Sequence, residues 1–420
     1  MEIPLNSAGR KRLAIGAAVA LCLIYLFLVG RLFVASVFAD KPELASLLRA
    51  TRLDQGNADY RNHLGRYYAL VARDPGAAIE PYRAAVQLNP HSARYWFDLA
   101  SSYQVLGDTS NQTWALEHAI QADPTTPDVA WEAANFYLVR GDNEKALREF
   151  HVVLESDPSM AGNAVQFCWR IEPDADTLLR DVVPARSTAY TAFLNLLISK
   201  QETAAAAKVW AALIATTQTF EMSELTEYLQ YLLNHKEVDQ ARLVWQQAAP
   251  RFGLSSYVPT RNNLIVNGNF SLDVLNGGFD WQYQKQPSVT LTLDPGEFHG
   301  GARRSLLIGF DGPGVNDAGI RLFIAVQPNT TYEFSAYYKN GDFEGAGGPH
   351  LTIQDVYTQT VLYDSDELTE AAGFWKSVTG EFTTGNESKL LVLHVRRLPE
   401  GSPIRGKLWV DDFRLVAKRE

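Results

Sequence analysis

The sequence predicts a multidomain chain, α then β, with three successive parts: an N-terminal transmembrane helix, an α-helical solenoid and a C-terminal antiparallel β-sandwich. Three observations support this order. Residues 13–30 carry no charge, sequence marks recur every 34 residues between about 59 and 160, and after Pro259 the hydrophobic pattern changes from helical to alternating. A chain of 420 residues is long enough for two or three domains with full-sized cores.

The N-terminal segment joins a basic cluster, at positions 10–12, to the uncharged run 13–30. As a helix this run would rise about 27 Å, close to the hydrocarbon thickness of a bilayer. Basic residues next to a span remain on the cytoplasmic side. We therefore predict a single-pass membrane protein with residues 1–12 in the cytoplasm, a transmembrane anchor at 13–39, and the bulk of the chain periplasmic or extracellular.

A cleaved signal peptide is the alternative for this segment. It would end at Ala39, where the small residues suit a cleavage site. However, the apolar core is long and Arg31 interrupts it before that site, so an uncleaved anchor is favoured.

Charge and cysteine content exclude some classes of function. The net charge of −10 argues against nucleic acid as a partner, because such proteins need a basic face to neutralise phosphates. The two cysteines, Cys22 in the apolar run and Cys168 in an expected helix, are not expected to pair.

The central part repeats with a fixed period. Pro90, Pro124 and Pro158 follow one another at intervals of 34 residues. Apolar residues before each proline repeat at the same interval, as do Tyr82, Leu116 and Phe150. Between these marks apolar residues recur at helical intervals, so each unit is expected to form two amphipathic helices joined at a Gly-Asp turn. Proline ends the second helix because it has no amide hydrogen to donate and disfavours helix just before it.

This pattern resembles the tetratricopeptide repeat (TPR), with units at 59–92, 93–126 and 127–160 inside a repeat region that runs from 42 to 160. In the last two units the matching residues are Trp96, Leu99, Ala100, Tyr103, Gly107, Ala119 and Pro124, then Ala134, Tyr137, Gly141, Ala146, Phe150 and Pro158. The first helix of the first unit is out of phase by about one residue. Residues 161–252 are interpreted as degenerate helical repeats that continue the solenoid.

The resemblance implies protein binding in a groove lined by the first helix of each repeat. Carried over by position, the lining residues are Arg94, Phe97, Ser101, Gln104, Asp128, Trp131, Asn135 and Leu138. The phase of the helix would point Phe97 and Trp131 outward, although both could equally cover the core.

After a linker at 253–262, residues 263–418 have the pattern of a β-sandwich. Alternating runs such as "TYEFSAYYK" and "KLLVLHVRR" are separated by clusters rich in Gly, Pro, Asn and Asp. This layout predicts antiparallel strands joined by turns.

Several segments of this part resemble the jelly-roll carbohydrate-binding modules of the family-four, family-nine and family-twenty-two kind, within the galactose-binding-like superfold. They are "NLIVNGNF", "GFDW", "VQPNTTYEFSAYYK", "FWKSVTGEFTT" and "LWVDDFRL", in the expected order. The resemblance implies sugar binding on an exposed strand face. The polar strand positions that could take part are Tyr337, Gln354, His394 and Arg396. Each could instead be a solvated outer-face residue, and the domain could serve as a spacer or a protein-docking module.

The same resemblance implies a structural calcium ion, with Asp411 as the matching acid. The family places an acid directly after "NGNF", whereas this chain has Ser271, so Asp273 would have to substitute. No other cofactor is expected.

Two adjacent acids in the last strand, Asp411 and Asp412, raise the question of a catalytic pair. In a regular strand neighbouring side chains point to opposite faces, so Asp411 is expected to share a face with Trp409, Phe413 and Leu415, and Asp412 the other. The chain also has none of the HExxH, Walker, CxxC or GxSxG motifs. We therefore do not expect an enzyme.

These expectations combine into a membrane-anchored, non-catalytic TPR scaffold that mediates protein–protein interactions at a bacterial cell envelope, in a setting such as polysaccharide assembly or export. The partner protein is not identified by the sequence. The alternative is a glycan-binding receptor, in which the jelly-roll domain binds polysaccharide and the solenoid is a stalk.

Overall fold

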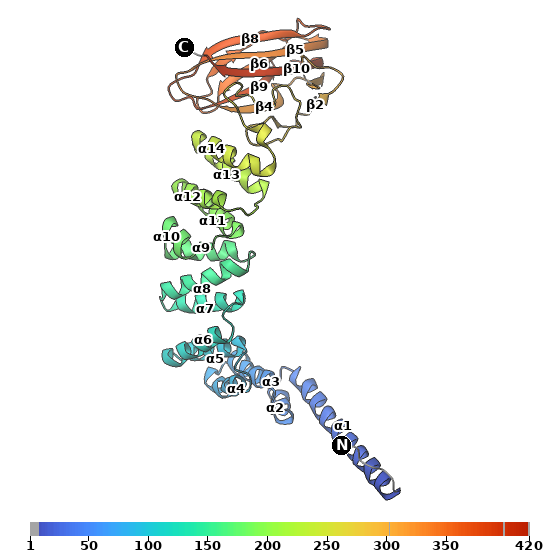
Figure 1. Ribbon diagram of the computed structural model, residues 1–420, viewed down its shortest axis with the longest axis vertical. Helices are drawn as coiled ribbons and strands as arrows, with labels where there is room; N and C mark the ends of the chain where they lie inside the picture. Colours follow the sequence, from blue (N-terminus) through green and yellow to red (C-terminus); the bar gives the residue numbers. More distant parts are fainter. Residues whose placement is uncertain (1–7, 302, 398–399, 419–420) are drawn as a thin grey trace. The chain divides into compact units, whose positions relative to one another are not determined.

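The computed structural model describes residues 8–301, 303–397 and 400–418, and the chain divides into two compact units, one up to Leu196 and one from Leu197 onward (Figure 1). The first unit is helical. The second contains the last helices and two β-sheets. An N-terminal apolar helix, a repeat solenoid and a C-terminal antiparallel sandwich are thus the architecture that the sequence predicts.

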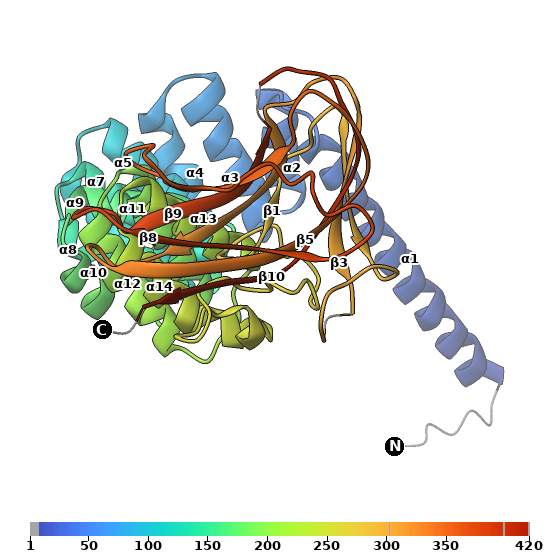
Figure 2. The same ribbon diagram turned by 90° about the horizontal axis from the view of Figure 1, so that it is seen from above.

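The chain begins with one long helix, α1 (Ala8–Ala39), drawn in Figure 2 without interruption. It is long and apolar enough to cross a membrane, a property that signal sequences share, and the side chains of its central part are exposed. Its last turns pack on α2 (Leu44–Leu53), where Ala35 and Ala39 become buried. Arg31 Nε donates a hydrogen bond to the Leu53 carbonyl oxygen (2.5 Å).

Helical pairs follow in the first unit, with these bounds: α3 (Ala58–Arg66) with a π-helical turn η1 (Tyr67–Val71), α4 (Pro75–Leu88), α5 (Ala93–Val105), α6 (Thr109–Ala122), α7 (Pro127–Val139), α8 (Asn143–Ser156), α9 (Ala161–Ile171), α10 (Ala175–Asp181) and α11 (Ser187–Ser199). Asp74, Asp108 and Asp142 cap the second helices of the three repeats. Each carboxylate accepts a hydrogen bond from the amide three residues later. The N-terminal caps of these helices therefore recur every 34 residues, with the period of the sequence repeat.

The π-helical turn explains why the first repeat is out of phase. A π-turn holds one more residue than an α-turn. The extra residue lies at Tyr67–Val71, before the cap at Asp74 returns the chain to register. Earlier in the same helix Gly65 lies against the ring of Tyr82, since an added Cβ would approach that ring to 2.5 Å.

The second unit starts with helices α12 (Thr203–Ala215), α13 (Met222–Asn234) and α14 (Val238–Ala248), followed by the 3-10 turns η2 (Ala249–Phe252) and η3 (Ser255–Tyr257). Two five-stranded antiparallel sheets come next, one in the order β1-β4-β9-β6-β7 and the other in the order β2-β3-β10-β5-β8. The strands are β1 (Gln282–Tyr283), β2 (Val289–Asp294), β3 (Ser305–Gly312), β4 (Asp317–Ala325), β5 (Thr331–Gly345), β6 (Pro349–Asp355), β7 (Val361–Asp364), β8 (Lys376–Thr383), β9 (Leu390–Arg397) and β10 (Ile404–Ala417). Alternate residues of both sheets fill one shared core.

A β-bulge in β10 changes the expected orientation of the two closing acids. Asp411 pairs with Tyr337 and Arg414 with Ser335, so β10 has one extra residue between them, and Asp412 adopts φ 50°. Phe413 consequently turns into the core, which the regular alternation did not predict. The expectation that Asp411 shares a face with Phe413 and Leu415 is wrong because of this extra residue.

The last helical pair contacts the β-sandwich directly within the second unit. The indole of Trp245 on α14 is 2% exposed, donates to the Tyr257 carbonyl oxygen (2.8 Å), and lies so close to Gly278 that an added Cβ would approach it to 2.6 Å. Tyr357 Oη donates to the Leu233 carbonyl oxygen (2.7 Å). The segment predicted as a linker at 253–262 is therefore folded at this junction, with Tyr257 buried.

Candidate functional site

The polar residues predicted to line the repeat surface lie in the open. Arg94, Ser101 and Gln104 are exposed on α5, and Asp128 is exposed on α7. Leu138 is half-buried, and Asn135 is half-buried with its amide donating to the Trp131 carbonyl oxygen (2.9 Å). The first helices of two repeats thus present polar groups that a protein partner can reach.

The two aromatic residues predicted to point outward instead fill space between helices. Trp131 packs edge-on against Phe150 and Phe167, each with ring centroids 5.6 Å away. Phe97 stacks on Phe136 with ring centroids 6.0 Å apart. These contacts agree better with the alternative prediction, that Phe97 and Trp131 cover the core. Aromatic pairs at these distances stabilise the packing between helices.

A row of exposed valines was missed at the sequence level. Val71, Val105 and Val139 each lie three residues before a capping aspartate and are 62%, 74% and 72% exposed. Their spacing of 34 residues was visible in the sequence, but an apolar residue at the end of an amphipathic helix is ordinarily assigned to the core. Apolar side chains repeated at one exposed position are typical of a protein-binding surface.

A polar row crosses the outer face of the β1-β4-β9-β6-β7 sheet. In register across the five strands stand Gln282, Arg321, His394, Thr352 and Asp364. Arg321 is exposed and donates to the Gln282 side chain (3.3 Å), whereas Thr352 donates to Asp364 (2.8 Å). Planar amide, guanidinium and imidazole groups side by side are suited to hydrogen bonding with sugar hydroxyls.

Three of the four predicted glycan-binding residues belong to this face. His394 and Arg396 are two apart on β9, and Gln354 pairs with Val392 on the same sheet. His394 Nδ1 is 2.7 Å from Asp317 Oδ2, while its Nε2 has no hydrogen-bond partner among the described residues. The spacing of two residues places His394 and Arg396 on one face, whereas only the register between strands brings Gln354 to the same face.

The fourth predicted residue, Tyr337, lies on the other sheet and is covered. The imidazole of His299 stacks on its ring at 3.6 Å between centroids. The same histidine contacts both closing acids: its amide donates to Asp411 (2.8 Å) and its Nδ1 is 2.6 Å from Asp412. Tyr337 and the two acids thus form one packed cluster around a loop, and Tyr337 is no open platform for a sugar.

Comparison with known proteins agrees with the geometry of the β part. The family model of a carbohydrate binding domain matches residues 262–399. The C-terminal domain is carbohydrate-binding-module-like. The helical part is similar to the small glutamine-rich tetratricopeptide repeat-containing protein 2 of Mycosarcoma maydis, with 29% identity over 91 residues. That match covers 22% of this chain and only 26% of the relative.

Solved structures with similar parts include a CBM4 module, with 15% identity, a TM-score of 0.27 and coverage of 37% of this chain and 99% of that one. PilF of Pseudomonas aeruginosa has 16% identity, a TM-score of 0.26 and coverage of 53% and 94%. MamA has 18% identity, a TM-score of 0.24 and coverage of 41% and 84%.

The residues predicted to hold calcium in the carbohydrate-binding-module-like domain are engaged elsewhere. Both oxygens of Asp411 accept amide hydrogens, from His299 and Asp412, each at 2.8 Å. Asp273 forms an ion pair with Arg304 (2.7 Å), whose Nε also donates to the Phe270 carbonyl oxygen (2.8 Å). A guanidinium thus supplies positive charge beside the "NGNF" turn. A calcium ion held by Asp411 and Asp273 stays a prediction.

Burial sets the ionisation of two acids in this domain. Asp411 and Asp280 are both fully buried, and loss of solvation raises the pKa of each carboxyl to about 6. For Asp411, the two amide hydrogen bonds oppose this rise because they favour the charged form. With both oxygens accepting amide hydrogens, the buried carboxyl of Asp411 holds the His299 loop to the bulge of β10.

Proposed function

We propose that this protein is a membrane-anchored, non-catalytic TPR scaffold of the cell envelope that binds protein partners, in a setting such as polysaccharide assembly or export. The observation that supports it best is the exposed valine row flanked by polar groups: Val105 and Val139 lie at the ends of helices whose open residues include Arg94, Gln104 and Asp128. Protein–protein interfaces have an apolar centre and a polar rim, and the valines with the polar residues around them have this arrangement.

Site-specific photocrosslinking in the full-length protein tests this proposal. A benzophenone amino acid at Val105 or Val139 is expected to yield a discrete crosslinked protein band in native membranes. The matched control is Glu117, which is exposed on α6, the second helix of the same repeat as Val105. Bands of equal strength from all three positions, or no protein band from the two valines, would contradict the scaffold.

The second candidate function is a glycan receptor, and the polar row of the carbohydrate-binding-module-like domain favours it. Arg321, His394 and Gln282 stand side by side across three strands on one outer face. The family match supports the assignment of carbohydrate as the ligand class. In this version the solenoid is a stalk.

Arg321→Ala is expected to weaken binding to polysaccharide about tenfold, because a guanidinium that donates to sugar oxygens contributes about 1.5 kcal/mol or more. Affinity electrophoresis of the full-length protein in detergent, through gels containing neutral glucans or uronic-acid polysaccharides, measures this loss. Arg414→Ala is the matched control, an exposed arginine on the outer face of the opposite sheet. If no polysaccharide retards the unmodified protein, the receptor function fails and the scaffold stands alone.

A further inference from the structure

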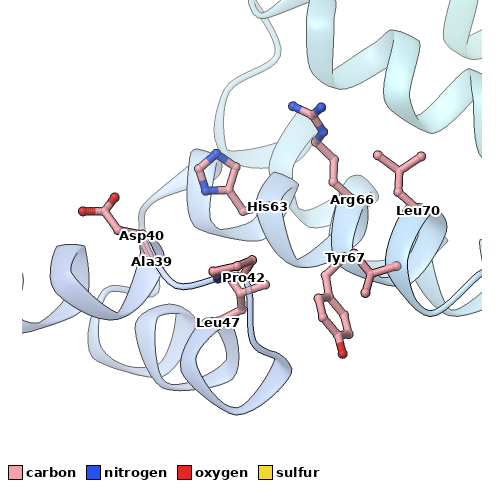
Figure 3. Close-up of a pocket in the computed structure, with 9 residues that line it drawn as sticks. Ala39, Asp40, Pro42, Leu47, His63, Arg66, Tyr67 and Leu70 are labelled. Atoms are coloured by element: carbon pink, nitrogen blue, oxygen red, sulfur yellow. The ribbon is translucent and has the colours of Figure 1, made fainter.

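A small cavity lies where the anchor helix meets the first repeat (Figure 3). It has a volume of about 250 Å³, and Ala39, Leu47, Tyr67, Leu70 and Val71 contribute to its lining. His63 and Arg66 stand at the same cavity. The end of α1 and the end of the first repeat's first helix therefore share one surface.

This surface is apolar and open. Leu70 and Val71 are 66% and 62% exposed, and they follow each other in the π-helical turn η1. In the two later repeats the corresponding valine is as exposed, but it has no anchor helix beside it. The first repeat thus differs from the two later repeats in having the anchor helix beside its valine as well as in its π-helical turn.

The anchor helix is held against this repeat. Arg31 bonds to the carbonyl at the end of α2, and Ala35 and Ala39 are buried. One side of the last two turns of α1 is therefore packed on the folded domain, whereas Leu32, Phe33 and Val37 on the rest of these turns stay exposed. A bilayer that encloses the helix up to Arg31 would reach the surface of the first repeat.

The charge of the adjoining segment is opposite to that of the chain. Residues 41–73 contain six basic and three acidic residues, a net charge of +3, and are flanked by Asp40, which lines the cavity, and by Asp74, whereas the whole chain carries −10. Lys41 and Arg49 both lie over the ring of Phe38 at the end of α1, at 5.9 and 5.5 Å from its centroid. Basic groups beside a membrane span attract anionic headgroups.

We propose that the first repeat docks on the membrane surface: Leu70 and Val71 enter the headgroup–acyl boundary, and Arg49, Arg66 and their basic neighbours contact anionic phospholipid headgroups. The bilayer is favoured over a protein occupant because the patch is continuous with the anchor and the local charge matches anionic lipid. This inference rests on the proposed membrane anchor. The docking adds to the anchor a second membrane contact, made by the first repeat of the solenoid.

The three equivalent valines provide the test and its controls in one set. In a Cys22→Ala background, with Cys168 buried, Val71→Cys, Val105→Cys and Val139→Cys are each labelled with the environment-sensitive dye NBD. The full-length protein is placed in nanodiscs of phosphatidylcholine with or without phosphatidylglycerol. The label at position 71 is expected to shift to the blue and to be quenched severalfold more by headgroup-proximal spin-labelled lipid than the labels at 105 and 139.

The anionic contact has its own readout. Combined Arg49→Gln and Arg66→Gln substitutions are expected to reduce the quenching at position 71 severalfold in phosphatidylglycerol discs, and to leave it unchanged in phosphatidylcholine discs. Equal quenching at all three positions in protein that remains in the discs would overturn the inference alone. A blue shift at position 71 without lipid quenching would assign the patch to a protein and also overturn it. Protein that does not remain in the discs would overturn the anchor itself, and the docking with it.

Discussion

Replacing Trp245 by alanine is expected to lower the free energy of unfolding of the second unit by about 3–5 kcal/mol. The side chain is 2% exposed, its indole N–H bonds to the Tyr257 carbonyl oxygen, and its ring contacts Gly278. Removal leaves a cavity and an unpaired carbonyl between α14 and the sandwich. Urea unfolding followed by circular dichroism measures the loss, and limited proteolysis near residues 249–262 reports whether the junction opens.

Tyr357→Phe is the control for this junction. It removes only the hydroxyl that donates to Leu233 and keeps the ring, so a loss of about 1 kcal/mol is expected, with no new cleavage. If Trp245→Ala costs no more than Tyr357→Phe, the helical pair and the sandwich are not joined through the tryptophan.

The pH dependence of stability is expected to reflect Asp280 and Asp411, whose pKa values burial raises to about 6. An unfolded aspartate loses its proton near pH 4, whereas the native carboxyl keeps it until about pH 6. The native state therefore binds more protons in this interval. The contribution of these two groups to stability is largest below about pH 4, falls as the pH rises through 6, and is then constant.

Isosteric amides at the two positions are expected to act in opposite directions above pH 6. Asp280 Oδ2 accepts the Leu275 amide (2.8 Å), and Oδ1 has no partner among the described residues. Asp280→Asn therefore removes a buried charge and keeps the contact with the Leu275 amide, so a gain of about 1–3 kcal/mol is expected. In Asp411 both carboxylate oxygens accept hydrogen bonds from backbone amides. Asp411→Asn replaces one of these oxygens by an NH₂ group that faces a backbone N–H, so the free energy of unfolding is expected to fall by about 1–3 kcal/mol.

Urea unfolding of both variants at pH 5 and pH 8 checks this pair of outcomes. The slope of stability against pH is expected to become shallower in Asp280→Asn. Changes of the same sign in the two variants would show that burial alone decides the energetics of these acids, without the amide hydrogen bonds.

Sequence periodicity was sufficient for the parts of the fold that repeat, because caps and core positions recur together. The period was sufficient for the Gly-Asp turns that contain Asp108 and Asp142, and the structure adds that both aspartates cap the next helix. The π-turn at Tyr67–Val71 left a visible trace as a phase error of one residue. The bulge at Asp412 left none, because a single extra residue in a strand is defined by the partner strand, and Tyr337, the partner of Asp411, is 74 positions away.

The candidate surfaces could be predicted only in part for the same reason. His394 and Arg396 are neighbours on one strand, so alternation placed them on one face. That Arg321 and Gln282 continue the row depends on register between strands, which pattern alone does not define. For Trp131 the helical phase allows both an outward and a core-covering position, and contact with Phe167 from a later helix favours the core-covering one.

The junction at Trp245 also decides how the molecule would respond to mechanical load. A flexible tether would let a bound polymer swing freely and would transmit little tension. Here a pull on the sandwich would first act on interdigitated groups: the indole against Gly278, the hydroxyl of Tyr357 on Leu233, and the ion pair of Lys389 with Asp239 (3.1 Å). These contacts load in parallel, so the last helical pair and the sandwich would move together as a single lever.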